Sequence, residues 1–186
     1  MEKETLRRDI RRRVDGLTAH ERATASRTLC RALEQLSEYR GAGCVMMYRG
    51  LPDEVDLAEL ERRALLEGKH VVMPRCRGPH IDLVQVVDDP AAWSAGPFGI
   101  KEPTGTQLVE PGLVDLVLTP GRAFDRTGRR LGRGGGYYDR LFSRPGFRAV
   151  CCGVGFDCQL VDTVPATGHD RPVQLVATPS KIIRCG

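Results

Sequence analysis

Val114-Asp115-Leu116-Val117-Leu118-Thr119-Pro120-Gly121 is a short apolar run that ends in a Thr-Pro-Gly turn. An apolar run of this length, closed by a turn, is typical of a buried strand. The segment at residues 128–140 follows the turn and combines glycines, arginines and two tyrosines, and Leu141 and Phe142 come next. We expect a helix to open at Tyr137, so that a strand, a glycine-rich loop and a helix follow one another.

Upstream of this stretch, the sequence predicts three helices. Leu6, Ile10 and Val14 recur at helical spacing with arginines between them, which is typical of an amphipathic helix. Thr18 and Glu21 form a capping box that starts the second helix. Gly16 is expected to end the first helix, Leu36 to lie in the second, and Asp56 and Gly68 to bound the third.

Short apolar runs predict strands between and after these helices. The predicted strands cover residues 44–48, 70–73, 81–87, 114–118, 149–154 and 181–184. Pro74 is expected to stop the second of them. Strands that alternate with helices predict a three-layer α/β fold, with a mostly parallel sheet and helices on both faces. We expect residues 1–186 to form a single domain.

The composition is that of an ordinary globular protein. The 186 residues are 41% hydrophobic and 28% charged, which is too apolar for a disordered chain. No apolar run approaches the ~20 residues that span a bilayer. The opening Met1-Glu2-Lys3-Glu4 is charged and lacks the apolar region of a secretory signal, so we expect a cytoplasmic protein without a membrane partner.

The seven cysteines and the arginines give weaker signals. The cysteine count is odd and no C-x-x-C pair occurs, which argues against a disulfide framework or a zinc ribbon. The net charge of +4 includes arginine clusters at residues 7–13 and 126–140. Such clusters could attract nucleic acid or phosphates, but charge alone favours two solvated faces.

Residues 128–140 contain the parts of a nucleoside-triphosphate site. Glycines allow positive φ and a close approach of the backbone to a ligand, and successive N–H groups can form an anion-binding nest. Arg130 and Arg133 add fixed charge, and a helix N-terminus adds its dipole. Asp139 could hold a Mg²⁺ ion that bridges phosphates. Neither standard phosphate-loop motif matches, and a glycine-rich surface loop is the alternative interpretation.

Residues 119–140 resemble the signature of the 5-formyltetrahydrofolate cyclo-ligase family, whose members are also called methenyltetrahydrofolate synthetases. Five further regions extend this resemblance over nearly the whole chain. They are Lys3-Glu4-Thr5-Leu6-Arg7, Asp53-Glu54-Val55-Asp56, Phe98-Gly99-Ile100-Lys101-Glu102-Pro103, residues 153–157 with Gln159 and Pro165, and His169-Asp170. Some relatives carry Lys in place of Gly135 and an acid in place of Gln174, so no metal role is assigned to Gln174.

The resemblance implies a role for each matching residue. The ATP contacts are Lys3, Arg7, Arg130, Leu131, Gly132, Arg133, Gly134, Gly135, Gly136, Tyr137 and Tyr138. The substrate contacts are Arg49, Glu54 and Tyr137. The metal ligands are Asp139 and Asp170, and the catalytic residues are Arg133 and Tyr138.

The resemblance also implies a reaction. ATP phosphorylates the formyl oxygen of 5-formyltetrahydrofolate, N10 attacks, and 5,10-methenyltetrahydrofolate, ADP and phosphate are released. ATP is the co-substrate, Mg²⁺ the cofactor and the reduced folate the substrate, and the protein is expected to be a monomer that binds no nucleic acid. The alternatives are a phosphate-binding module that docks RNA and an enzyme of related fold that acts on another phosphorylated metabolite.

Overall fold

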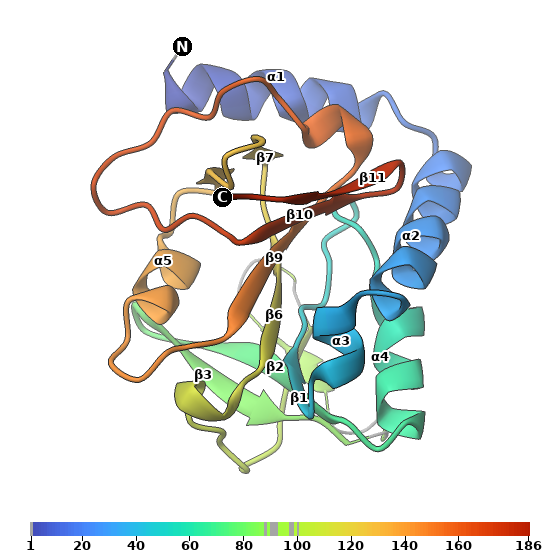
Figure 1. Ribbon diagram of the computed structural model, residues 1–186, viewed down its shortest axis with the longest axis vertical. Coiled ribbons are helices and arrows are strands. Elements are labelled where there is room, and N and C mark those ends of the chain that lie inside the picture. Colours follow the sequence, from blue (N-terminus) through green and yellow to red (C-terminus); the bar gives the residue numbers. More distant parts are fainter. Residues whose placement is uncertain (1, 88, 90–92, 97–98, 100) are drawn as a thin grey trace.

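A mixed sheet forms the centre of the molecule in the computed structural model, which describes every residue except 1, 88, 90–92, 97–98 and 100. Among the described residues, seven strands follow the order β11-β10-β9-β6-β1-β2-β3 (Figure 1). They are β1 (Cys44–Met46), β2 (His70–Arg77), β3 (His80–Gln85), β6 (Leu116–Pro120), β9 (Val150–Val154), β10 (Leu175–Thr178) and β11 (Lys181–Arg184). The five inner strands are parallel, and the edge strands β3 and β11 are antiparallel to their neighbours.

Helices cover both faces of this sheet. The helices are α1 (Lys3–Asp15), α2 (Ala19–Glu34), α3 (Ser37–Gly41), α4 (Ala58–Leu66) and α5 (Tyr137–Phe142). Side chains of successive strand residues point to opposite faces. Val45 therefore packs in one buried cluster with residues of α1, α2 and α4, and Met46 packs in a second cluster with Leu141 of α5. This arrangement confirms the predicted three-layer α/β fold with a mostly parallel sheet.

Two small hairpins and two 3₁₀ turns lie outside the central sheet. A small hairpin pairs β4 (Trp93–Ala95) with β5 (Lys101–Pro103), and a second one pairs β7 (Ala123–Phe124) with β8 (Arg130–Leu131). One 3₁₀ turn, η4 (Asp157–Gln159), follows β9 and packs against α1, and another, η3 (Pro111–Leu113), precedes β6. No helix in the described part of the chain is long and apolar enough to cross a bilayer.

The helix boundaries follow the local signals. Leu6, Ile10 and Val14 form the buried side of α1, and Gly16 ends it as predicted. Thr18 and Glu21 form the predicted capping box of α2. That helix ends at Glu34, so the prediction that it includes Leu36 is wrong, and Leu36 instead precedes α3.

Pro74 does not stop β2, contrary to the prediction. The strand continues to Arg77, paired with the edge strand β3. Val72 accepts a hydrogen bond from Met47 on the β1 side, and Pro74, two residues later, faces the same side. Because β1 ends at Met46, opposite Val72, no ladder hydrogen bond is required of the Pro74 nitrogen.

The chain reverses its direction of strand addition at β1. From β1 it adds β2 on one side, and then returns to place β6 on the other. Such a reversal opens a crevice beyond the carboxyl ends of the two strands, which is where ligands bind in open α/β sheets. The loop after β1 contains Glu54, and the loop after β6 leads to the glycine-rich segment.

Asp125 fixes the turn between β7 and β8. The carboxylate is 1% exposed and accepts hydrogen bonds from the backbone N–H groups of Thr127 (2.9 Å), Arg129 (3.1 Å) and Val164 (2.9 Å). The Thr127 hydroxyl donates a further one at 2.7 Å. Burial by itself would raise the pKa of Asp125, but these hydrogen bonds outweigh it and lower the pKa from its ordinary value of 3.8.

Asp125→Ala is expected to reduce the free energy of unfolding by about 3 kcal/mol, because it leaves buried donors without an acceptor. The folded pKa lies below the unfolded one, so this stabilisation is complete above pH 3.8 and is lost as the pH falls through the folded value. Urea unfolding of both proteins at several pH values measures this difference. A difference in stability that does not shrink below pH 3.8 would contradict the assignment.

Candidate active site

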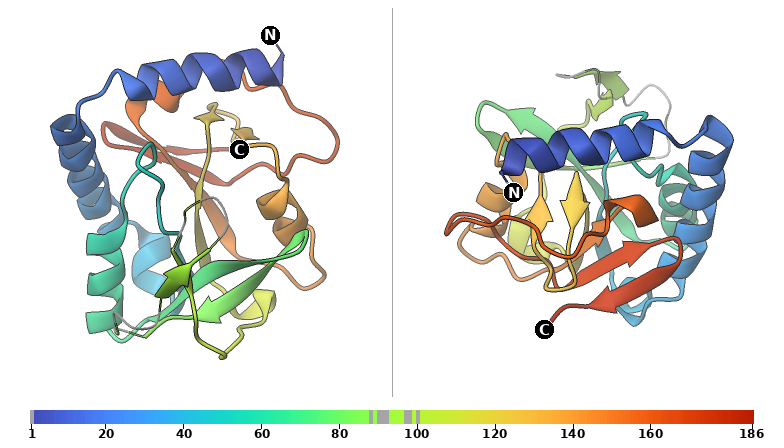
Figure 2. Two further views of the ribbon diagram at one scale, coloured as in Figure 1. Left: turned by 180° about the vertical axis from the view of Figure 1, so that it is seen from behind. Right: turned by 90° about the horizontal axis from the view of Figure 1, so that it is seen from above.

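Four segments meet beyond the carboxyl ends of β1 and β6. Helix α1 runs across this end of the sheet (Figure 2, right). Its second turn contacts the glycine-rich segment, where Arg7 Nε donates to the Gly132 carbonyl oxygen at 2.9 Å. The loop after β1 and the loop at residues 166–172 complete the site. This grouping brings together residues that lie far apart in the sequence.

Residues 132–136, here named the phosphate loop, expose a row of backbone donors. Gly134 and Gly136 have positive φ of 111° and 66°, and Gly135 between them does not. No described residue accepts a hydrogen bond from the backbone N–H groups of residues 132–136. Helix α5 has only six residues, so its dipole adds little. The loop N–H groups themselves are therefore the main donors that this segment could offer to an anion.

Arg130 lies beneath the phosphate loop and holds Asp139. Its side chain is 3% exposed and its guanidinium lies 3.2 Å from both carboxylate oxygens of Asp139. The rings of Tyr138 and Phe142 lie 5.4 and 5.9 Å from the guanidinium carbon. In this arrangement Arg130 neutralises and orients Asp139, and its predicted contact with phosphates stays a prediction.

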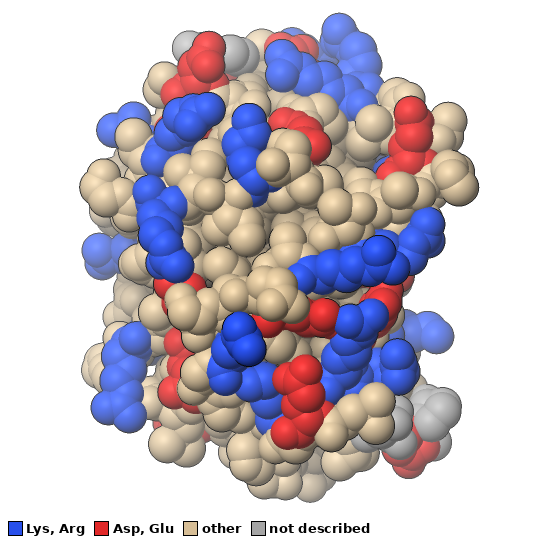
Figure 3. All heavy atoms as spheres, turned by 45° about the vertical axis from the view of Figure 1, so that its right-hand side comes forward, with Lys and Arg blue, Asp and Glu red and all other residues tan. Residues whose placement is uncertain are grey.

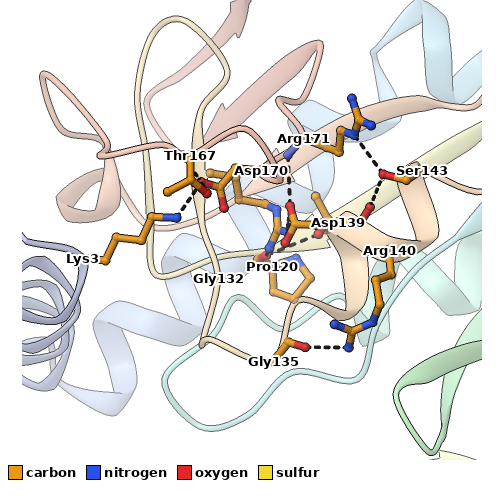
Figure 4. Close-up of polar contacts among 12 residues, drawn as sticks. Lys3, Pro120, Gly132, Gly135, Asp139, Arg140, Ser143, Thr167, Asp170 and Arg171 are labelled. Carbon is orange, nitrogen blue, oxygen red and sulfur yellow. Dashed lines mark hydrogen bonds and ion pairs between the residues drawn. The ribbon is translucent and has the colours of Figure 1, made fainter.

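The two predicted metal ligands lie on either side of this segment (Figure 4). Asp139 also accepts a hydrogen bond from the Arg171 backbone N–H at 3.1 Å. Asp170 pairs with Lys3 at 2.5 Å and accepts from the Thr167 N–H (2.5 Å) and hydroxyl (3.0 Å). Partial burial opposes ionisation of Asp170, but the Lys3 and Thr167 contacts outweigh it and lower its pKa. Both carboxylates are thus held in place by cations or N–H groups.

Residues 49–54, here named the acidic loop, join the phosphate loop through Arg133. Arg133 Nε donates to Glu54 at 2.9 Å, and a terminal nitrogen donates to Asp53 at 2.5 Å. Burial opposes the charge of Arg133, but Glu54 and Asp53 raise its pKa. Sequence reasoning identified Glu54 and Arg133 and missed Asp53, although Asp53 lies in the same quoted motif.

The ring of Tyr138 packs beside Arg130 and Phe142. Its burial and the nearby Glu54 carboxylate raise the pKa of its hydroxyl, while Arg130 opposes that effect. The hydroxyl is therefore a neutral donor at physiological pH. Tyr137 points elsewhere, since its hydroxyl donates to the Gly78 carbonyl at 3.2 Å and Arg140 lies 5.1 Å from its ring centroid. Of the two tyrosines, Tyr138 is the one influenced by both Arg130 and Glu54, and its predicted catalytic role stays a prediction.

Arg49 is the first residue of the acidic loop, and contacts with Glu61 and Trp93 hold its side chain. Its guanidinium donates to Glu61 at 2.7 Å and lies 4.2 Å from the ring centroid of Trp93. The structure thus gives Arg49 protein partners, and its contact with substrate stays a prediction. In the motif at residues 98–103, Phe98 and Ile100 lie outside the described residues. Glu102 of that motif is buried and accepts from the Cys76 N–H at 3.0 Å.

Gly135 and Gln174 each have a local structural setting. A Cβ atom on Gly135 would lie 2.9 Å from the Tyr137 ring, so a larger residue there requires the ring to move. Gln174 accepts a hydrogen bond from the Cys151 N–H at 2.8 Å, beside the strand pair β9–β10. Its role here is structural.

On one face of the molecule, acidic side chains interrupt the arginines. On the face drawn in Figure 3, lysines and arginines are interspersed with carboxylates. Several of these arginines form ion pairs, such as Arg63 with Glu34 at 2.6 Å. On α1, Arg11 pairs with Asp15 at 3.6 Å. This mixing of charge favours the interpretation of solvated faces over a polyanion-binding surface.

Comparisons with known proteins agree over the length of the chain. A model of the 5-formyltetrahydrofolate cyclo-ligase family matches residues 1–179. The 5-formyltetrahydrofolate cyclo-ligase of Saccharomyces cerevisiae is 29% identical, with 94% of this chain and 93% of that protein covered. The mouse (Mus musculus) protein of the same name is 27% identical, with 94% and 92% covered.

The fold agrees as well. The solved structure of 5,10-methenyltetrahydrofolate synthetase from Aquifex aeolicus matches with a TM-score of 0.88 at 34% identity. The match covers 99% of this chain and 93% of that one. The similarity therefore includes both the central sheet and the segments that build the site.

Proposed function

The chain belongs to the 5-formyltetrahydrofolate cyclo-ligase family, and we propose that it uses ATP to convert 5-formyltetrahydrofolate to 5,10-methenyltetrahydrofolate, with release of ADP and phosphate. One observation carries this proposal. The phosphate loop and the acidic loop meet through Arg133 at the crevice beyond β1 and β6. A phosphoryl donor and a folate bound to these loops would lie side by side.

The reaction must make a poor leaving group depart. The formyl oxygen of an amide-like group does not leave as hydroxide when N10 attacks the formyl carbon. Transfer of the γ-phosphoryl group to that oxygen turns it into phosphate, which leaves as the new C–N bond forms. The enzyme must hold the oxygen in line with the γ-phosphorus and stabilise the charge on the phosphoryl oxygens.

The described residues match these tasks. Backbone N–H groups of the phosphate loop bind the phosphates, and Lys3 and Arg7 close over them from α1. Arg133 lies between the two loops and stabilises the transferring phosphoryl group. Tyr138 donates a hydrogen bond toward the reacting oxygen, and Glu54 holds the folate.

Magnesium fits this site only as an ion that phosphates help to hold. Among the described residues, no group of three or more His, Cys, Asp or Glu side chains is placed to bind a metal. Mg²⁺ typically takes one or two carboxylates and completes its shell with phosphate oxygens and water. Asp139 and Asp170 supply those carboxylates beside the phosphate loop. The bound ion would neutralise phosphate charge.

Purified protein tests the proposal directly. We expect the absorbance of methenyltetrahydrofolate to rise only when 5-formyltetrahydrofolate, ATP and Mg²⁺ are all present. A gel shift with random RNA tests the binding-module alternative, and competition by folates tests the alternative of another metabolite. Absence of product together with RNA binding would overturn the proposal.

A further inference from the structure

Asp53 is shared between two arginines that come from different parts of the chain. One carboxylate oxygen accepts from Arg133 at 2.5 Å, and the other accepts from Arg122. Its neighbour Glu54 pairs with Arg133 at 2.8 Å. Asp53 therefore links the acidic loop to two positions on the segment that follows β6.

Arg122 is the fixed end of this link. Its side chain is 13% exposed. Its backbone N–H donates to the Leu131 carbonyl at 2.6 Å, and its carbonyl accepts from Gln159 at 3.1 Å. The main chain at Arg122 is thus held on both sides, because β7, β8 and η4 all pack around it.

Arg133 is the free end. It lies within the phosphate loop, flanked by Gly132 and by Gly134, whose φ is positive. Its side chain is 37% exposed and forms ion pairs with the two carboxylates of the acidic loop. A guanidinium on such a flexible backbone can turn toward bound phosphates. A second contact is then needed to limit the range of positions that the guanidinium adopts.

We infer that Asp53 is a positioning residue that ties Arg133 to the fixed Arg122 and so couples folate binding at the acidic loop to nucleotide binding at the phosphate loop. This inference rests on the proposed function. When folate engages Glu54, Arg133 loses one of its carboxylate partners and keeps the other. Asp53 then holds the guanidinium over the phosphate loop, where the γ-phosphoryl group must lie.

The charge of Asp53 suits this role. Its burial opposes ionisation, but the hydrogen bonds from Arg133 and Arg122 outweigh this effect and lower its pKa. The carboxylate stays anionic at physiological pH, so it keeps both arginines as partners. Amide substitution removes the charge at nearly constant shape.

The test measures coupling between two ligands in the full-length protein. Calorimetry gives the affinity for a non-hydrolysable ATP analogue with Mg²⁺, with and without saturating 5-formyltetrahydrofolate. In the wild type we expect folate to tighten analogue binding about 5-fold or more. In Asp53→Asn this ratio should fall to about 1, while the affinity for the analogue alone changes by less than about 3-fold, and kcat should fall about 10-fold.

Two further variants and one control make the outcome specific. Arg122→Met removes the fixed end and should also abolish the coupling, and Asp53→Glu should restore part of it. The control is Glu38→Gln, which removes a partly buried carboxylate paired with Arg184 far along the chain from the site. Melting temperatures establish that each variant is folded.

Coupling that persists in Asp53→Asn or in Arg122→Met would overturn the inference, as would an equal loss in Glu38→Gln. If the wild type makes the product but shows no coupling, the inference is wrong and the proposed function still stands. A wild type that neither binds folate nor makes product would overturn both.

Discussion

Asp139→Asn is expected to lower kcat about 100-fold or more, because it removes a carboxylate that we propose to hold the Mg²⁺ ion that neutralises phosphate charge. The same change should reduce the free energy of unfolding by on the order of 3 kcal/mol, since the buried Arg130 then loses its charged partner. Steady-state kinetics at saturating Mg²⁺ and urea unfolding measure the two effects.

A double variant separates the two roles of Asp139. Arg130→Met combined with Asp139→Asn removes the buried charge as well as its partner, and uncharged replacements of buried ion pairs are often close to neutral in stability. We expect the double variant to regain most of the lost stability and none of the lost turnover. Recovery of turnover along with stability would show that Asp139 acts through the fold alone.

Arg133→Ala should lower kcat/KM for ATP by about 100-fold, because the variant lacks the guanidinium between the two loops. The loss should appear in both KM for ATP and kcat, and Arg133→Lys should recover only part of it, since an ammonium lacks the planar fork. Initial rates over a range of ATP concentrations provide the measurement.

Arg11→Ala is the matched control for Arg133→Ala. Arg11 lies on α1 and forms a surface ion pair with Asp15, so its removal should change stability by less than about 1 kcal/mol and leave the kinetics unaltered. An Arg133→Ala variant with wild-type ATP dependence would refute the assignment of Arg133 to the phosphoryl group.

Local signals account for the parts of the fold that the sequence predicted. The Thr18–Glu21 capping box and the Gly16 end of α1 depend on neighbouring residues, and both are present in the structure. The prediction that Pro74 stops β2 is wrong because a strand accepts proline at this position only where the neighbouring strand β1 has already ended. The sequence around Pro74 does not contain that information. Strand β10 was missed, although Leu175, Val176 and Ala177 are a buried apolar run, because its short length resembles many loop segments.

The candidate site also has one part that the local sequence predicts and another part that it does not. The glycines and arginines of residues 130–136 predict a phosphate site from the local sequence alone. The pairing of Lys3 with Asp170 and of Arg133 with Asp53 depends on which loops the sheet brings together, and no local pattern contains that information. The burial of Arg130 was also unpredictable, because it follows from the packing of α5 rather than from the arginine spacing.

The contact between Lys3 and Asp170 joins residues 167 positions apart. During synthesis, the first helix leaves the ribosome long before the loop that contains Asp170. Lys3 therefore lacks its ion-pair partner until that loop has emerged. The site that we propose for ATP is therefore incomplete until residue 170 has been synthesised and has left the ribosome. Any binding of ATP by the nascent chain should appear only late in translation.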